Sequence, residues 1–297
     1  MLLINDTYML GRRLGNGSFG EVFEGTDVKT RKPVAIKIEP INNEASQILK
    51  HEYGVYRDIY QSGCDLAQIY YFGIEDDYNV MVMDALGKSM SELLAQCGGK
   101  FSLKTTLMIG DQMISRLEYV HDKCYVHRDL KPENFLVGMG YCTNKIYLID
   151  YGLAKRYRQD DKHISFKAGN KLVGTARYAS VNSHLGIRLS RRDDLESLLY
   201  ILVYFLKGML PWQNLKYKDK NDKYQAILRV KATITPQTLC TQLVEGASAT
   251  VDKTFQLFME HVKSLDFVAR PDYHYLRSLL RDLMHACGYQ YDLSFDW

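Results

Sequence analysis

The string with the clearest chemistry reads His127-Arg128-Asp129-Leu130-Lys131-Pro132-Glu133-Asn134. It fills every defined position of the pattern H-R-D-L-x-x-x-N, in which phosphoryl transfer depends on positioning more than on covalent chemistry. Asp129 is expected to orient an attacking hydroxyl and accept its proton, and Lys131 to neutralise the transferring phosphoryl group. Asn134, further along the same string, is a candidate metal ligand.

A second acid stands at the end of an apolar run. Asp150 opens the triplet Asp-Tyr-Gly directly after residues 146–149, which are predicted to form a strand. An aspartate at the end of a buried strand is poorly solvated unless it binds a cation. Since Mg²⁺ prefers carboxylate and phosphate oxygens, we expect Asp150 and Asn134 to bind Mg²⁺ together with oxygens of ATP.

Near the N-terminus a glycine pattern reads Gly15-Asn16-Gly17-Ser18-Phe19-Gly20-Glu21-Val22. A lone G-x-G-x-x-G is compatible with a dinucleotide site, a phosphate loop of the kinase type or a plain glycine turn. The residues after Gly20 alternate like a strand, whereas a dinucleotide site needs a helix there. The pattern therefore favours a loop whose backbone N–H groups close over nucleotide phosphates.

The string Val34-Ala35-Ile36-Lys37 predicts a strand lysine that reaches nucleotide phosphates. Such a lysine needs a carboxylate to hold it. Glu52, on a predicted helix, is the first candidate, and Glu44, at the start of that helix, is the alternative.

Elements of two kinds must position these groups. Short runs rich in Val, Ile, Tyr and Phe predict strands at 8–14, 20–28, 33–39, 67–74 and 78–84, interrupted by one helix at about 44–61. The Asp76-Asp77 pair is expected to turn the last two strands into a hairpin. After Gly87 the periodicity predicts helices at 89–97, 103–124, 191–208, 221–230, 250–263 and 272–286. A small strand-rich part therefore precedes a larger helical part, and the two join near 84–87.

Length and composition exclude other classes of protein. The chain has 297 residues, 46% hydrophobic and 25% charged, which is ordinary globular usage. Its longest apolar run, Leu198–Leu206, is too short to cross a membrane and predicts a buried helix. Asp6 interrupts what would be the apolar core of a secretory signal. The scattered cysteines are expected to be reduced thiols, at positions 64, 97, 124, 142, 240 and 287.

Charge is concentrated in one stretch. Residues 155–192 contain ten Lys or Arg and two acids, a local charge of +8 in a chain whose net charge is +3. Such a stretch either attracts an anion or forms a solvated face. Directly after it, Asp193 and Asp194 open a Leu-rich helix. Asp194 is expected to be buried and to accept backbone N–H groups of the His127–Arg128 turn.

With these residues in hand, the chain resembles the eukaryotic protein kinases, and specifically the casein kinase I family. The general signature is Gly15, Gly17, Gly20, Lys37, Glu52, Asp129, Asn134 and Asp150. The segments typical of the family are Gly174-Thr175-Ala176-Arg177-Tyr178-Ala179-Ser180-Val181-Asn182-Ser183-His184-Leu185-Gly186, Ser190-Arg191-Arg192-Asp193-Asp194-Leu195-Glu196-Ser197-Leu198 and Leu210-Pro211-Trp212-Gln213.

The resemblance implies an α+β bilobal protein-kinase fold over residues 8–285. Its N-lobe (1–83) would be a small antiparallel sheet with one main helix, its hinge 84–87, and its C-lobe (88–297) mainly helical. The implied adenine pocket has Met83 as gatekeeper and Asp84 and Leu86 as hinge, and its other members are Leu14, Val22, Ala35, Leu136 and Ile149. Acidic or already phosphorylated protein substrates imply a basic pocket, for which the candidates are Arg128, Lys155, Lys171, Arg177 and Lys223.

The chain departs from the family at a few positions. Tyr151 replaces the usual phenylalanine, and its hydroxyl must find a partner if it is buried. Leu130 and Glu133 are the general-kinase residues, and Lys171 is displaced by one position. No regulatory tail is expected. Between Gly152 and Gly174 the one hydroxyl of a serine or threonine is that of Ser165, so we expect activity without phosphorylation of this segment.

The resulting hypothesis is a monomeric Ser/Thr protein kinase that uses ATP and Mg²⁺, in the cytoplasm or nucleus. A scaffold without activity is the first alternative, although such scaffolds usually lack one of the Lys, Asp or metal positions. A nucleic-acid surface over 155–192 is the second, but stacking aromatics do not alternate with its basic residues. A tyrosine kinase is the third, and Lys131, which is typical of the Ser/Thr class, argues against it.

Overall fold

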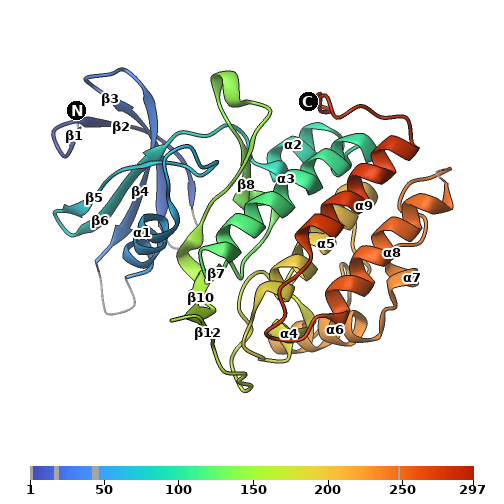
Figure 1. Ribbon diagram of the computed structural model, residues 1–297. Helices are drawn as coiled ribbons and strands as arrows, with labels where there is room; N and C mark the ends of the chain where they lie inside the picture. The colour runs from blue at the N-terminus through green and yellow to red at the C-terminus, as the bar shows by residue number, and fades with distance from the viewer. Residues whose placement is uncertain (1–2, 17–19, 42–46, 247) are drawn as a thin grey trace. The chain divides into compact units, whose positions relative to one another are not determined.

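The computed structural model describes residues 3–16, 20–41, 47–246 and 248–297 (Figure 1). Its contacts group into two compact units. The first comprises Met1–Lys88 and Leu136–Ala154, and the second comprises Ser89–Phe135 and Lys155–Trp297. The segment 136–154 thus belongs with the strand-rich N-terminal residues, although a large part of the helical unit precedes it in the chain.

The first unit contains a six-stranded antiparallel sheet in the order β1-β2-β3-β4-β6-β5. The strands are β1 (Leu3–Ile4), β2 (Tyr8–Asn16), β3 (Glu21–Asp27), β4 (Pro33–Pro40), β5 (Ile69–Glu75) and β6 (Tyr78–Asp84). Five of them confirm the strands predicted from composition, and the short β1 was not predicted. A tight turn with a left-handed Asp76 joins β5 to β6 as expected.

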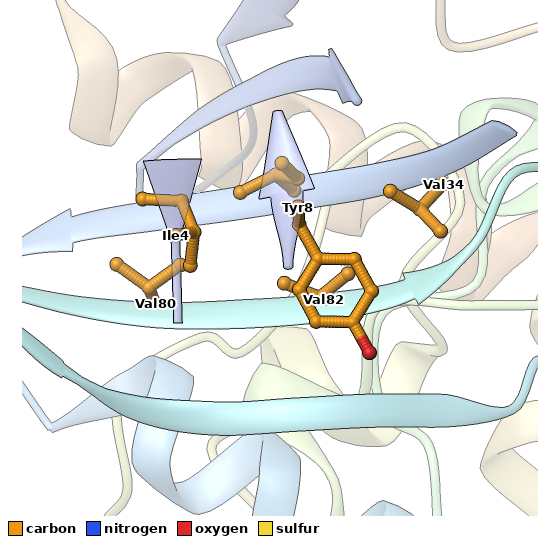
Figure 2. Packing of buried hydrophobic residues seen from close by; sticks show 6 residues of the cluster. Ile4, Tyr8, Val34, Val80 and Val82 are labelled. Carbon is orange, nitrogen blue, oxygen red and sulfur yellow. The ribbon is translucent and has the colours of Figure 1, made fainter. Parts of the chain in front are cut away.

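The two faces of this sheet carry different residues. On one face lies an apolar cluster that includes Ile4, Tyr8, Val34, Val80 and Val82 (Figure 2). Side chains alternate between faces along a strand, so the odd-numbered neighbours in β4 point to the other face. The fold of β4 therefore separates the packing residues from the residues predicted to bind nucleotide.

Helix α1 (Ile48–Ile59) is the one long helix among the described residues of the first unit. It is shorter than the helix predicted at 44–61, whose first residues fall partly in 42–46, outside the described residues. It packs against the strands and against the turn η3 (Tyr151–Leu153). There the ring of Tyr56 meets the ring of Tyr151 edge-on, with centroids 4.9 Å apart.

The second unit is mainly helical, as expected. Its helices are α2 (Met90–Gln96), α3 (Leu103–Asp122), α4 (Val181–His184), α5 (Arg191–Lys207), α6 (Lys220–Thr233), α7 (Pro236–Leu239), α8 (Ala249–Ser264) and α9 (Tyr273–Ala286). α5 is buried over almost its whole length and packs against α3 and α8, which confirms that the run Leu198–Leu206 is a core helix. The short α4 and α7 were not predicted, because four residues are too few to show helical periodicity.

Other irregular parts complete the units. Short strands pair as β8 (Phe135–Val137) with β9 (Ile146–Leu148), β7 (Tyr125–Val126) with β10 (Lys155–Arg156), and β11 (Arg158–Gln159) with β12 (Lys162–His163). Single 3-10 turns are η1 (Pro132–Asn134) and η2 (Gly140–Cys142). All six cysteines are free, as predicted. Among the described residues, no helix is both long and apolar enough to cross a membrane.

Candidate active site

The candidate site residues fall into two groups, one in each compact unit. In the first unit the strand register gathers the nucleotide candidates on one face of the sheet. Val22 pairs with Lys37, and Ala35 pairs with Met83. Directly opposed residues of antiparallel strands point to the same face, so these four side chains share the face opposite the apolar cluster.

Lys37 forms the expected ion pair on this face. Its Nζ lies 2.7 Å from Oε1 of Glu52, and both side chains are largely buried. Burial opposes the charge, yet the carboxylates of Glu52 and Asp150 raise the pKa of Lys37. Glu44, the alternative partner, lies outside the described residues.

Asp150 lies in the same unit and adds a second carboxylate to this pair. Its backbone is left-handed, with φ of 67°, which sets it apart from the strand that precedes it. The next residue, Tyr151, is fully buried and donates its hydroxyl to the carbonyl oxygen of Leu148 at 3.2 Å. The predicted need of that hydroxyl for a partner is therefore met inside the turn that carries Asp150.

The glycine pattern is described in part. Gly15 pairs with Val22 and Asn16 with Glu21, so the described ends of the pattern continue two antiparallel strands. A Cβ at Gly20 would run into the carbonyl oxygen of Ile38, so a glycine is required there. Gly17, Ser18 and Phe19 lie outside the described residues.

The predicted hinge is held by backbone and side-chain bonds. Asp84 accepts hydrogen bonds at its carboxylate from the Gln68 backbone N–H, at 2.8 Å, and from the Tyr70 hydroxyl. Beyond it, the N–H of Gly87 donates to the carbonyl oxygen of Val137 at 2.8 Å.

Leu86 and Leu136, two candidates for the adenine pocket, each directly precede one partner of the bond between Gly87 and Val137. Ile149 directly follows β9, the strand that pairs with β8. Leu14, another candidate for the adenine pocket, is 54% exposed.

In the second unit the carboxylate of Asp129 has partners on both oxygens. Oδ1 accepts from the backbone N–H and the hydroxyl of Thr175, each at 2.8 Å, and Oδ2 lies 3.0 Å from Nζ of Lys131. Thr175 was not assigned a role from the sequence, although it falls within a segment typical of the family. A Cβ at its neighbour Gly174, which has φ of 83°, would meet the carbonyl oxygen of Arg128.

Asp194 holds the backbone of the His127–Arg128 turn, as the sequence predicted. Its carboxylate accepts the backbone N–H groups of His127, at 2.7 Å, and Arg128, at 2.9 Å. It also lies 2.9 Å from Nε2 of His121. Burial opposes its charge, but these donors hold the pKa of Asp194 below its usual value. Because Arg128 is left-handed, with φ of 71°, the two bonds stabilise a backbone conformation that an arginine rarely adopts.

The donor atoms present suit a magnesium ion. Asn134 donates its amide nitrogen to the carbonyl oxygen of Asp129 at 2.9 Å, so its amide oxygen is the end turned to other partners. An amide oxygen, like the carboxylate oxygens of Asp150 in the first unit, is a kind of ligand that Mg²⁺ takes. Among the described residues no cluster of three or more His, Cys, Asp or Glu could hold a metal ion by itself.

The five basic candidates lie in two cavities of the second unit. Arg128, Lys155 and Lys171 line the first, and Arg156 and Arg188 also line it. Burial, followed by repulsion from Arg128, Arg188 and Lys167, lowers the pKa of Lys155. The charge count over 155–192 already contained Arg156 and Arg188, but it could not say which cations lie together.

Arg177 and Lys223 line the second cavity, a groove of about 1010 Å³ that Lys131 and Thr175 also line. The predicted basic pocket is thus two sites. The groove includes two residues that contact the carboxylate of Asp129, namely Thr175 and Lys131.

Comparison with protein families matches the protein kinase domain over residues 8–281. The matched range contains every candidate residue described above, from Leu14 to Lys223.

Proposed function

Since this chain belongs to the protein kinase domain family, we propose that it is an active Ser/Thr protein kinase of the casein kinase I type. Its substrates are proteins that carry an acidic or phosphorylated residue near the acceptor hydroxyl. The family supports ATP as phosphoryl donor, with Mg²⁺ as the usual metal ion.

The chemistry assigned to the second unit rests on Asp129. In this proposal its carboxylate orients the substrate hydroxyl and accepts its proton, while Lys131 balances charge on the transferring group. Thr175 fixes one carboxylate oxygen with two hydrogen bonds, so the side chain has a single orientation before substrate arrives. A carboxylate that is already oriented loses less conformational entropy when the substrate binds and reacts.

The first unit is assigned to nucleotide binding. Lys37, held by Glu52, would contact the ATP phosphates, and Asp150 with Asn134 would bind Mg²⁺, which neutralises charge on the phosphates when bound. The adenine would lie against the sheet face that carries Val22, Ala35 and Met83. The other members of this set are Leu14, Gly15, Asn16, Gly17, Ser18, Phe19, Gly20, Asp84, Leu86, Leu136 and Ile149.

One observation carries the substrate assignment: a cavity with five Lys or Arg side chains and no acidic residue in its lining. Arg128, Lys155 and Lys171 belong to it. Cations that line one cavity repel one another, so an anion bound among them is favourable. The groove with Arg177 and Lys223 supports the same substrate class, because Lys131 also lines it and these three cations outnumber its one acid, Glu133.

Phosphate transfer to four matched peptides tests this proposal. Three have a serine acceptor, with phosphoserine, glutamate or arginine three residues upstream, and one has a tyrosine acceptor. Transfer from Mg-ATP to the first two, lost in Asp129→Asn, is the expected result. Preference for the arginine or tyrosine peptide would overturn the substrate assignment, and ATP binding without transfer to any peptide would indicate a scaffold.

We also propose that the enzyme is active without phosphorylation of residues 153–173. The segment around Ser165 is held by hydrogen bonds that involve no phosphate: Arg188 backbone N–H donates to the Lys167 carbonyl at 2.7 Å and Asn170 N–H to the Gly186 carbonyl at 2.9 Å. Arg188 Nη1 also donates to the Ser165 carbonyl at 2.9 Å.

Ser165→Ala is therefore expected to keep kcat within about twofold of the unchanged enzyme, since no bond of a phosphate is needed to order the segment. Phosphatase-treated enzyme, with mass spectrometry to verify its state, is the matched control. Inactivity of both forms, with recovery after phosphorylation of Ser165, would contradict this.

A further inference from the structure

A lysine of α6 is fully buried and donates to backbone carbonyls of the segment 174–179. Nζ of Lys231 lies 3.0 Å from the carbonyl oxygen of Ala176 and 2.5 Å from that of Ala179. These two carbonyls flank Arg177. The lysine itself does not line the groove that Arg177 lines.

Aromatic rings complete the surroundings of this lysine. Nζ of Lys231 lies 4.8 Å from the ring centroid of Trp212 and 4.9 Å from that of Tyr200. Trp212 in turn donates Nε1–H to the carbonyl oxygen of Arg177 at 2.7 Å. Lys231 and Trp212 thus donate to the backbone carbonyls of Ala176, Arg177 and Ala179.

The charged and titratable groups that face Lys231 do not supply a simple ion pair. Burial lowers the pKa of Lys231 to about 7, and Glu196 of α5 opposes that effect. The carboxylate of Glu196 already accepts the hydroxyl of Tyr200 at 2.6 Å and the N–H of Val181 at 2.9 Å. His184 of α4 contacts the same Ala176 carbonyl at 3.2 Å, and burial, followed by repulsion from the lysine, lowers its pKa. A lysine buried at this cost indicates that its directed bonds matter.

The position of Lys231 in α6 connects two parts of the groove. Lys223, in the first turns of the same helix, lines the groove together with Arg177. Eight residues of helix span about 12 Å, so the bonds of Lys231 fix the Arg177 backbone relative to Lys223. The adjacent Thr175 contacts the carboxylate of Asp129, so the same segment also reaches the reacting group.

We propose that Lys231, together with Trp212, is a positioning residue that sets the spacing of Arg177 and Lys223 and thereby the selectivity for a phosphorylated or acidic residue of the substrate. This inference rests on the proposed function. It assigns selectivity to Lys231, which does not line the groove, and to Trp212, which lines it and holds the Arg177 carbonyl.

Steady-state kinetics with two peptides test it: a serine peptide with phosphoserine three residues upstream and the same peptide with alanine there. Lys231→Met keeps the length of the side chain and its aromatic contacts but cannot donate. The ratio of kcat/KM between the two peptides should fall about tenfold or more, with KM for ATP within about twofold. Arg177→Ala should have a similar effect. Adding Lys231→Met to it should change the ratio little, because both act through Arg177.

Lys207→Met is the matched control, since Lys207 also donates to a backbone carbonyl, that of Thr241 at 3.0 Å, outside the groove. It should leave the ratio unchanged. If Lys231→Met does not fold, Trp212→Phe, which keeps a ring and loses the bond to Arg177, should still lower the ratio by about threefold.

The outcomes separate the two proposals. Lys231→Met could lower the melting temperature and leave the ratio of kcat/KM between the two peptides unchanged. That result, or the same result in Trp212→Phe if only that variant folds, would overturn the positioning role and leave the proposed function intact. Fully additive effects of Lys231→Met and Arg177→Ala would also overturn it. Equal use of both peptides by the unchanged enzyme would overturn the substrate assignment and this inference with it.

Discussion

Lys37 and Glu52 form an ion pair in which the carboxylate is the more buried partner, with side-chain exposures of 15% and 4%. Two charges removed from water are costly unless they stay together. Here Asp150 adds a further negative charge that raises the pKa of Lys37. The pair therefore keeps the ammonium charged and in one orientation, as contact with nucleotide phosphates requires.

Glu52→Gln is expected to lower kcat by roughly 10- to 100-fold, because the lysine loses the charge that orients it and small misplacements are costly. Steady-state kinetics over a range of ATP concentrations is the measurement. KM for the peptide should change little.

Glu39→Gln provides the matched control for this change. Glu39 is also buried, but its carboxylate accepts from neutral groups, the Leu49 N–H at 3.3 Å and the Asn79 amide at 3.2 Å. This variant should lose stability and keep more of its kcat than Glu52→Gln, since Glu39 lines the same cavity as Lys37 while Glu52 forms the ion pair with it. Equal kcat losses in both variants would show that any buried carboxylate of the sheet has the same effect, contrary to the prediction.

The sequence could predict residues whose role depends on a local motif. Lys37, Asp129 and Asn134 each belong to a short string with defined spacing. Thr175 and Lys231 could not be assigned in this way, because their partners lie 46 and 55 residues away in the chain. Such pairs depend on how helices and loops pack, and local spacing does not encode packing.

Among the elements, α5 has a structural role for catalysis. Its first turn carries Asp193, which caps the helix, and Asp194, which holds the loop before Asp129. Both are buried acids at a helix N-terminus, where the helix dipole favours negative charge. A core helix therefore anchors the catalytic loop by its end, not by its apolar face.

Asp194→Asn is expected to destabilise the protein by about 2–4 kcal/mol, because one of two buried backbone N–H groups loses its charged acceptor. Urea unfolding is the measurement, and kcat should fall because Arg128 loses support for its left-handed backbone. The exposed Asp122→Asn is the control. A loss of stability below about 0.5 kcal/mol, as for ordinary surface changes, would contradict this role.

Helix α4 supplies a pH-dependent contact. Burial, and then repulsion from Lys231, lowers the pKa of His184 from 6.5 to about 4. The folded protein therefore binds fewer protons at this residue than the unfolded chain between these values, so its stability falls as the pH falls from 6.5 to 4. Partial solvent exposure limits the effect to about 1–2 kcal/mol.

His184→Gln should remove this part of the pH dependence while keeping a side-chain donor near the Ala176 carbonyl, which His184 contacts at 3.2 Å. The measurement is the free energy of unfolding of both proteins at pH 7 and pH 5. Parallel losses in the two proteins would contradict the prediction.

At the scale of the whole molecule, periodicity predicted both kinds of unit and the boundaries of most long elements. The grouping of 136–154 with the N-terminal strands could not be predicted, because it depends on pairs such as Gly87 with Val137 that join distant parts of the chain. Likewise, the charge of +8 over 155–192 left an anion site and a solvated face both open, and it could not show that the basic candidates line two cavities. Charge counts give the sign of a field, and tertiary packing decides where it is concentrated.

The distribution of charge over the molecule makes a prediction about salt. A chain of net charge +3 with +8 in one stretch attracts an acidic peptide locally, and mobile ions screen that attraction. KM for the phosphoserine peptide is therefore expected to rise roughly five- to tenfold between 0.05 and 0.5 M NaCl, and KM for its alanine counterpart less than about twofold. Saturating Mg-ATP removes the nucleotide from the comparison. A parallel rise for both peptides would assign the effect to general screening of the enzyme, because the phosphoserine is the one group by which the two peptides differ.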